Sequence, residues 1–268
     1  MIQQLLLCFF LLCGSTYGLQ IPRSKNRENV LHEENVPKTR VVPMSVNQKQ
    51  YADALHNYQA KIVIGTGPAG TGKTLFPCIE SIDLLSAGKI NKIVITRPLV
   101  TVEEDLGFLP GSLDDKMSPW TRPIFDIFLE SFSKKELDKM LFDNTIEIAP
   151  LAFMRGRTFK DACIIADEMQ NCSPGQMEML TTRIGKGSRL FITGDLNQSD
   201  RGDLNGLKDI VNRISTYYNN NPTTHRMVEL VSLDANDVQR SKIVKHMIGI
   251  YAYDPRNVYD DPNELIAC

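Results

Sequence analysis

A glycine-rich stretch between a short apolar run and a helical run constrains the fold of this chain more than any other feature. It is Gly67-Pro68-Ala69-Gly70-Thr71-Gly72-Lys73-Thr74, a full match to the phosphate-binding loop pattern. Its glycines let the backbone curl so that successive N–H groups point at one anion, next to a helix N-terminus that favours negative charge. We therefore expect Lys73 to reach the β- and γ-phosphates of a nucleotide and the Thr74 hydroxyl to bind Mg²⁺. The alternative is an ordinary glycine-rich turn, which the flanking strand and helix disfavour.

The segments on either side of this loop alternate between short apolar strands and helical periods. The expected strands are 61–64, 92–96, 145–148, 162–166, 189–193 and 227–231. The expected helices include 47–58, 72–86, 124–141 and 174–183. Short apolar strands that alternate with helices are typical of a buried parallel sheet. We therefore expect an α/β domain whose mainly parallel sheet is flanked by helices.

Two adjacent acids follow the apolar run 162–166. A site that hydrolyses a nucleotide needs a carboxylate near the metal at the end of a buried strand. Asp167 would hold Mg²⁺ through a water, and Glu168 would orient or deprotonate the attacking water. A strand that runs into a solvated turn would have the same pattern, but the upstream loop favours the catalytic interpretation.

Polar residues also follow the run 189–193, where the ligand of an open parallel sheet is expected. Gln198 is a candidate sensor of the γ-phosphate and Asp195 a candidate organiser of the site, with a plain turn as the alternative. Gln48, ahead of the first strand, could recognise the adenine edge through its amide. A helix-capping role or a surface role fits the position of Gln48 equally well.

The overall composition excludes several classes of protein. The chain has 268 residues, and its 30 Lys and Arg against 32 Asp and Glu leave a net charge of −2. Its 42% of hydrophobic and 23% of charged residues are close to the globular average, which excludes a disordered or fibrous protein. A mean hydropathy of −0.20 excludes a multispanning membrane protein. The near-neutral charge excludes a histone-like nucleic-acid coat and leaves room for a local basic face.

The N-terminus differs from the rest of the chain. Residues 1–18 carry no charged side chain, and their apolar run at 5–13 is followed by small and polar residues. This pattern predicts a cleaved signal or targeting leader, with a short anchor or an upstream artefact as alternatives. Residues 19–44 are expected to form a flexible arm and 254–268 a tail. We expect no stable membrane insertion once the leader is removed.

The spacing of the cysteines indicates the redox state of the compartment in which the protein is expected to work. Cys78, Cys163, Cys172 and Cys268 show no CxxC spacing, which favours buried free thiols over disulfides. Free thiols are typical of a reducing, cytoplasm-like compartment. The leader instead suggests the secretory entry point or an organelle, so both localisations stay open.

These residues resemble the PhoH family of ATP-binding proteins, which are relatives of the core of superfamily 1 helicases. The segments that carry the resemblance occur in order at 47–49, 67–74, 96–98, 106–111, 122–123, 154–158, 182–185 and 193–195. The resemblance implies a single RecA-like P-loop NTPase domain over residues 45–253. It also implies that 167–171 is the Walker B element, with Met169 where Ala is usual, and that Asp195 and Gln198 belong to the third helicase-like motif.

The resemblance adds a catalytic arginine and a nucleic-acid partner. The family's C-terminal motif falls at 237–241, which keeps Arg240 and changes its neighbours. Trp120 and Phe125, near Arg122, are candidate stacking surfaces for single-stranded RNA or DNA. Two basic groups could contact phosphates: Arg155, Arg157 and Lys160, and Arg183, Lys186 and Arg189. Solvated charges and core aromatics are the alternatives for these residues.

Together these features predict an ATPase that uses Mg²⁺ and drives the remodelling or unwinding of single-stranded RNA or DNA. A P-loop phosphotransferase is one alternative, and it would need a lid that the sequence does not suggest. A nucleotide-gated binding or regulatory module with little turnover is the other alternative.

The resemblance also suggests a homo-oligomer. The charge that grows on a transferred phosphoryl group needs a cation, and residues 45–253 can hold only one RecA-like core. Either Arg240 supplies that cation within the chain, or a neighbouring copy supplies Arg155, Arg157 or Arg183 across a head-to-tail interface. We favour the neighbouring copy, and by family resemblance a hexameric ring.

Overall fold

The computed structural model describes residues 41–98, 113–199 and 205–239 and four isolated positions beyond them, and of residues 113–119 the backbone alone. The leader at 1–18, the arm up to residue 40, the segment 106–111, Arg240 and the tail at 254–268 lie outside the described residues. No helix of the described ranges is long and apolar enough to cross a membrane.

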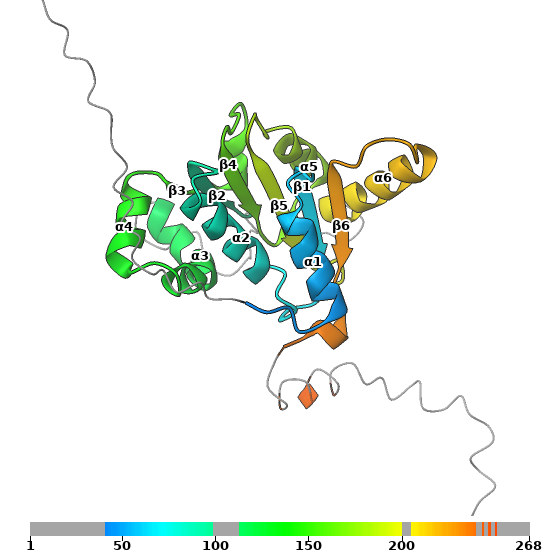
Figure 1. The fold of residues 1–268 in the computed structure, drawn as a ribbon, viewed down its shortest axis with the longest axis horizontal. Helices are drawn as coiled ribbons and strands as arrows, with labels where there is room; N and C mark the ends of the chain where they lie inside the picture. Colours follow the sequence, from blue (N-terminus) through cyan, green and yellow to red (C-terminus); the bar gives the residue numbers. More distant parts are fainter. Residues whose placement is uncertain are drawn as a thin grey trace, which may run out of the picture. The chain divides into compact units, whose positions relative to one another are not determined.

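The core of the fold is a six-stranded sheet in which every pairing is parallel (Figure 1). The strands are β1 (Ile62–Thr66), β2 (Lys92–Thr96), β3 (Ile146–Ile148), β4 (Ala162–Ala166), β5 (Arg189–Gly194) and β6 (Val228–Ser232). Their spatial order is β3-β2-β4-β5-β1-β6. The predicted α/β class with a parallel sheet is confirmed.

Helices cover both faces of this sheet (Figure 1). They are α1 (Val46–His56), α2 (Leu75–Ser86), α3 (Leu113–Leu129), α4 (Lys134–Phe142), α5 (Pro174–Thr181) and α6 (Gly206–Asn220). Three short 3₁₀ helices are η2 (Leu151–Met154), η3 (Met169–Asn171) and η5 (Ala235–Asp237). Helices α1 to α4 share one hydrophobic core with the sheet, and α5, α6 and η2 share the other.

The alternation of side chains along each strand divides these two cores. Val63 points to the core under α1 and α2, while its neighbour Ile64 points to the core under α5 and α6. Because both faces are covered, the four central strands are buried at nearly every position, as is typical of parallel strands. This continuous burial holds the carboxyl ends of β1, β4 and β5 side by side.

Three parts of the element prediction differ from the structure by more than two residues. The helix predicted at 124–141 is two helices, α3 and α4, because Ser133 and Glu136 form a capping box that starts a new helix. The helix predicted from residue 72 begins at Leu75, since the preceding residues complete the loop. Helix α6, which follows the N-cap Asn205, was not predicted. It is rich in Asn, Ser, Thr and Tyr, which are weak helix formers.

The described cysteines behave as the sequence predicts. Cys78, Cys163 and Cys172 are free thiols, and all three are buried. Burial raises the pKa of Cys163 to about 12 and raises that of Cys78 well above its ordinary value. Neither of these two thiols is a thiolate at neutral pH, so both act as small core residues.

Candidate functional site

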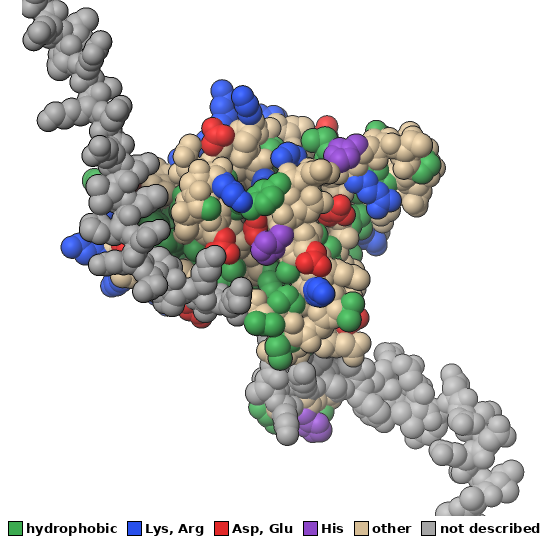
Figure 2. All heavy atoms as spheres, viewed as in Figure 1, with side chains coloured by type: hydrophobic (Ala, Val, Ile, Leu, Met, Phe, Trp, Pro, Cys, Tyr) green, Lys and Arg blue, Asp and Glu red, His purple; other side chains and the backbone are tan. Residues whose placement is uncertain are grey.

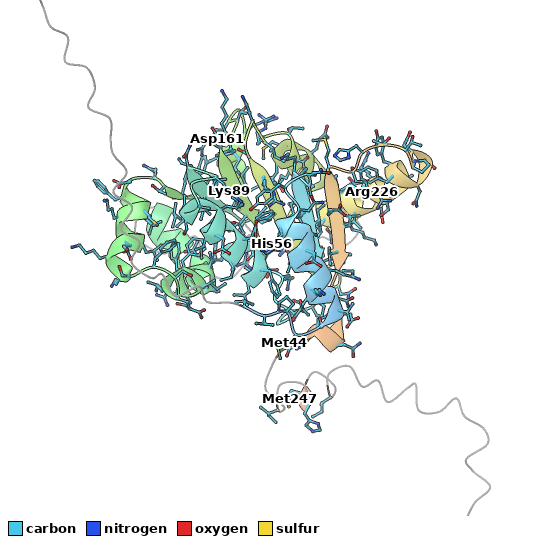
Figure 3. The ribbon with its side chains drawn as sticks, in the orientation of Figure 1. Met44, His56, Lys89, Asp161, Arg226 and Met247 are labelled. Carbon is cyan, nitrogen blue, oxygen red and sulfur yellow. The ribbon has the colours of Figure 1, made fainter. Side chains whose placement is uncertain are left out.

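The polar segments predicted from the sequence meet at one edge of the sheet, where the parallel strands end. The glycine-rich loop follows β1, the acid pair follows β4, and a polar turn follows β5, which lies between β1 and β4. Met44, just before α1, lies at this edge, whereas Asp161, just before β4, lies at the opposite edge (Figure 3). The strand order therefore assembles the site from segments far apart in the chain.

The loop has the curled backbone that its glycines predict. Gly67 has a φ of +153°, and a Cβ at this position would lie 2.6 Å from the carbonyl oxygen of Leu233, so only glycine fits. The Gly67 N–H donates to the Gly194 carbonyl at the end of β5, 3.1 Å away, which ties the loop to the neighbouring strand. The loop is thus held on two sides before any ligand binds.

Lys73 lies on the inner side of this loop and is almost fully buried. Its Nζ donates to the Pro68 carbonyl at 3.3 Å, while the Tyr51 hydroxyl donates to the Lys73 carbonyl at 3.0 Å. Burial raises the pKa of Tyr51 well above its ordinary value, so the phenol stays protonated as a donor. A cation next to the backbone of a glycine-rich loop can bind an anion such as a phosphate.

The first acid of the pair makes direct contact with the end of the loop. The Asp167 Oδ1 accepts hydrogen bonds from the hydroxyls of Thr74, at 2.9 Å, and Thr193, at 2.5 Å. Hydroxyl and carboxylate oxygens are the ligands that Mg²⁺ prefers in proteins, so this set fits that ion. The two residues predicted as metal ligands, Thr74 and Asp167, are thus brought together.

The second acid is held in position by Gln170, for which the sequence predicts no individual role. Glu168 has a φ of +54°, a left-handed conformation that costs a non-glycine residue about 1 kcal/mol or more. Its carboxylate accepts a hydrogen bond of 2.6 Å from Gln170 Nε2, and Gln170 Oε1 accepts from the Asp195 N–H at 3.1 Å. Gln170 therefore links the acid pair to the turn after β5. Gln170 and Thr193 lie within segments that carry the family resemblance, 167–171 and 193–195, and this is the signal that could have found them.

Gln48 lies in the first turn of α1, and its side-chain amide bonds to backbone groups. It is 3% exposed, so the surface role is wrong; the N-cap of α1 is Ser45, and recognition of adenine by Gln48 stays a prediction. Its Nε2 donates to the carbonyls of Thr71, at 3.0 Å, and Asp237, at 3.1 Å. Its Oε1 accepts from the Met44 N–H at 2.7 Å. Both donors of this amide are occupied by the backbone, so Gln48 fastens the loop to two other segments.

The turn after β5 carries the predicted organiser and sensor. Asp195 is buried, and its carboxylate accepts from the Asn197 N–H at 2.9 Å, which shapes the turn. Gln198 donates its backbone N–H to the Asp195 carbonyl at 3.2 Å, and its side chain is exposed at the same edge. Asp195 thus shapes this turn, and its role as organiser of the site and the γ-phosphate contact of Gln198 both stay predictions.

A cavity of about 430 Å³ opens beside the loop. Its polar lining includes the loop backbone, Lys73 and Thr74, and its apolar lining includes Val41, Val42 and Met44. These three residues belong to the arm that is expected to be flexible, but here they form a wall of the cavity, and Val41 packs on the core. The full lining is Val41, Val42, Met44, Gln48, Gly70, Gly72, Lys73, Thr74, Leu75, Phe76, Ile127 and Gln239.

A second and much smaller cavity, of about 10 Å³, has Asp167 in its lining. Thr96, Arg97 and Trp120 are among its lining residues. The Thr96 hydroxyl is fully buried and has no hydrogen-bond partner among the described residues.

Several predicted nucleic-acid residues have other contacts. Arg189 is 4% exposed and pairs with Glu80, so its place in a surface basic group is wrong. Arg157 is bound by Glu147 through two hydrogen bonds, of 2.6 and 3.0 Å. Phe125 packs against the core, as its alternative predicts. Arg155, Lys160 and Lys186 are exposed, and on the face that Figure 2 shows, basic side chains are interspersed with acidic ones.

The all-parallel sheet, with a glycine-rich loop after β1 and an acid pair after β4, defines an α/β protein of the RecA-like P-loop class. The family model of the PhoH-like proteins matches residues 40–252. This chain belongs to the PhoH family.

Bacterial relatives agree with this assignment. The chain is 37% identical over 252 residues to the PhoH-like protein of Bacillus subtilis, covering 90% of this chain and 74% of that protein. It is 39% identical over 217 residues to the PhoH-like protein of Mycobacterium leprae, covering 79% of this chain and 58% of that one. It is 34% identical over 209 residues to Protein PhoH of Escherichia coli K12, covering 76% of this chain and 56% of that one. The chain thus spans little more than half of two of these relatives.

Proposed function

We propose that this protein binds ATP with Mg²⁺ and hydrolyses it, and that hydrolysis drives the remodelling or unwinding of single-stranded RNA or DNA. One observation carries the ATPase proposal: the 2.9 Å hydrogen bond between Thr74, at the end of the loop, and Asp167, at the end of β4. It unites the phosphate-binding and metal-binding halves of a hydrolytic site. The cavity next to it, polar at the loop and apolar beyond, suits a ligand with an anionic end and a flat apolar end.

Each residue of the site then has a role. The loop N–H groups and Lys73 bind the phosphates, while Thr74 and Asp167 would hold Mg²⁺ directly or through water. When bound, this ion neutralises negative charge on the phosphate oxygens. Glu168 orients the attacking water and accepts its proton, and the hydrogen bond from Gln170 keeps the Glu168 carboxylate in place.

Hydrolysis also needs a cation besides Lys73 at the transferred phosphoryl group. Of the predicted donors, Arg157 is engaged by Glu147, and Arg183 donates to the carbonyls of Met179 and Arg157. Arg155 is exposed, and its side chain has no hydrogen bond with the described residues. Arg155 from a second copy is therefore the best candidate for this role, and Arg240 stays a prediction outside the described residues.

The nucleic-acid part of the proposal rests on the resemblance to superfamily 1 helicase cores and on exposed side chains. Arg155, Lys160 and Lys186 are exposed cations, and Trp120, next to Asp167 in the small cavity, is half-buried. A nucleic-acid strand that stacks on this indole would lie close to Asp167. Such a position suits an ATPase whose turnover responds to bound nucleic acid.

The Glu168→Gln variant tests this function. Glutamine has the size of Glu168 but cannot accept a proton, so we expect ATP binding to persist and turnover to fall by about 100-fold or more. Lys73→Ala should instead weaken ATP binding. The measurement is phosphate release with and without RNA, single-stranded DNA and phosphate acceptors, alongside ATP binding by calorimetry.

A matched variant makes this result specific. Glu178→Gln makes the same chemical change on the exposed side of α5 and should leave turnover unchanged. Equal turnover of Glu168→Gln and the parent protein would remove Glu168 from the mechanism. Phosphate transfer to an added acceptor, in place of water, would favour the phosphotransferase alternative.

A further inference from the structure

The cavity beside the loop has one wall that the phosphate groups of a nucleotide would not use. Val42 and Met44 line this wall, and their side chains are 63% and 71% exposed. Ile127 of α3 lines the same cavity. A flat base would cover these apolar side chains, but apolar contact cannot distinguish one base from another. The specificity must come from polar groups on the lining.

Two glutamines, Gln48 and Gln239, are among the residues that line this cavity. The Gln48 amide uses both of its N–H donors on the carbonyls of Thr71 and Asp237, and its oxygen already accepts from Met44. Gln48 would have to give up a buried backbone hydrogen bond in order to donate to a base. That exchange gains nothing, because a buried carbonyl left without a donor costs as much as the new bond returns.

Gln239 is placed differently. Its backbone N–H donates to the Gly70 carbonyl at 3.0 Å, which holds it against the loop. Its side chain is exposed, and its amide has no hydrogen bond with the described residues. Gln239 also lies within 237–241, where this chain differs from the family pattern around the arginine. The backbone of Gln239 is thus fixed against the loop, while its side-chain amide has no partner among the described residues.

We propose that Gln239 recognises the adenine base, and that Gln48 instead fastens the loop to the segments before α1 and after β6. This inference rests on the proposed binding of ATP. A glutamine amide pairs with adenine through two hydrogen bonds, in which its oxygen accepts from the 6-amino group and its N–H₂ donates to N7. Gln239 is therefore a specificity-determining residue, and Gln48 is a positioning residue.

The test combines altered ligands with altered side chains. Calorimetry measures the affinity of the full chain for four probes with Mg²⁺: ATP, 7-deaza-ATP, which lacks N7, purine riboside triphosphate, which lacks the 6-amino group, and tripolyphosphate, which lacks the base. We expect the parent protein to prefer ATP over either base analogue by about tenfold. Gln239→Leu should lose this preference and bind tripolyphosphate as the parent does.

Other variants separate recognition from positioning. Gln48→Leu should weaken ATP and tripolyphosphate binding by the same factor, because it loosens the loop and leaves the base contact intact. Gln239→Glu keeps the acceptor for the 6-amino group and should lose only the discrimination against 7-deaza-ATP. Gln59→Leu, an exposed glutamine beyond the other end of α1, is the matched control and should change nothing.

Opposite outcomes overturn the inference. If Gln239→Leu keeps the full preference for ATP over both analogues, Gln239 does not recognise the base. If the preference disappears in Gln48→Leu while tripolyphosphate affinity holds, Gln48 is the recognition residue. A parent protein that binds neither ATP nor tripolyphosphate would overturn the proposed function itself, whereas tight tripolyphosphate binding without any base preference would overturn only the role of Gln239.

Discussion

The hydroxyl of Thr96, at the end of β2, is fully buried and lacks a hydrogen-bond partner among the described residues. It shares the cavity of about 10 Å³ with Asp167. A void of this size holds about one water molecule, and an unsatisfied buried hydroxyl costs about 1–3 kcal/mol. We therefore expect one bound water between the Thr96 hydroxyl and the Asp167 carboxylate.

Thr96→Val tests for this water. Valine has the shape of threonine without the hydroxyl, so the water would lose a partner, and we expect the free energy of unfolding to fall by about 1 kcal/mol. Thr96→Ser keeps the hydroxyl and should retain the water-mediated contact. Chemical denaturation measures both variants. A Thr96→Val protein that is more stable than the parent would mean that the cavity is dry and the hydroxyl is simply unsatisfied.

At the scale of single residues, the sequence predicts those parts of the site that local chemistry determines. The loop residues, Asp167 and Glu168 were recognisable because residue types at fixed spacings, next to a strand, imply phosphate and metal binding. The hydrogen bonds of Gln48 were not predictable, because they join Gln48 to Asp237, and only the folded sheet brings these two residues together. The same holds for Thr193 and Asp167.

Among the elements, the C-terminal end of α1 contacts a buried arginine of β5, Arg189. The Arg189 guanidinium donates to the carbonyls of Leu55, Asn57 and Ala60 at 2.6, 3.0 and 3.1 Å. It also pairs with the buried Glu80 at 3.4 Å. These carbonyls lie at the C-terminus of α1 and just after it, where a helix favours a positive charge. Arg189 therefore fastens the end of α1 to the start of β5.

Arg189→Lys should weaken this connection. A lysine ammonium cannot reproduce the planar set of donors, so carbonyls and Glu80 would lose partners, and we expect a loss of about 2 kcal/mol or more in unfolding free energy. Arg213→Lys, on an exposed pair with Asp209 in α6, is the control and should change stability by about 0.5 kcal/mol or less. Denaturant midpoints measure both variants, and equal losses would contradict a special role of Arg189.

Strand β3, at the edge of the sheet, is held in place by two ion pairs. Glu147 of β3 bonds Arg157 at 2.6 Å and Lys92 of β2 at 2.9 Å. The hydrogen bond from Arg157 is the main cause that lowers the pKa of Glu147 below its ordinary value of 4.5, and Lys92 lowers it further. A lowered carboxyl pKa stabilises the fold above the ordinary value, and this stabilisation is lost as the pH falls through the lower, folded-state value.

Glu147→Gln should therefore melt at a lower temperature than the parent near neutral pH. The difference should shrink as the pH falls below about 4.5, because the parent then loses the same charge. Melting temperatures at a series of pH values from about 7 down to about 3 measure this convergence. A difference that stays constant with pH would mean that the side chain contributes through packing alone.

Element boundaries show what periodicity can and cannot determine. Strands β2 and β4 agree with their predicted ranges at both ends, because polar or turn residues bound each apolar run. The break between α3 and α4 was missed because the helical period continues across it, although the Ser133 and Glu136 capping box is visible in the sequence. Helix α6 is exposed or half-buried at nearly every position, and its weak helix formers gave little signal.

For the whole molecule, the proposed ATPase implies cooperation between copies. If Arg155 acts on the site of a neighbour, an Arg155→Ala protein and a Lys73→Ala protein should each be inactive alone. Mixing them should restore part of the ATPase activity, because some interfaces then pair an intact Arg155 with an intact Lys73. The activity of mixtures at several ratios measures this effect.

The size of the active species is the control for this experiment. Light scattering at the assay concentration should show an oligomer, with a hexamer expected from the family resemblance. A monomer with full ATPase activity would contradict donation between copies. So would an Arg155→Ala protein that is fully active alone.

The common direction of the strands also determines where a label or tag can be attached without disturbing the candidate site. All strands end at the same edge as the candidate site, so the turns that precede the strands lie at the other edge. Gly88, in the turn between α2 and β2, has no atom within 4 Å of where a Cβ would stand. A cysteine introduced for a dye beside this turn, or an affinity tag inserted into it, would leave the site free on the opposite edge. The protein could then be attached to a surface with every copy presenting its site to the solution.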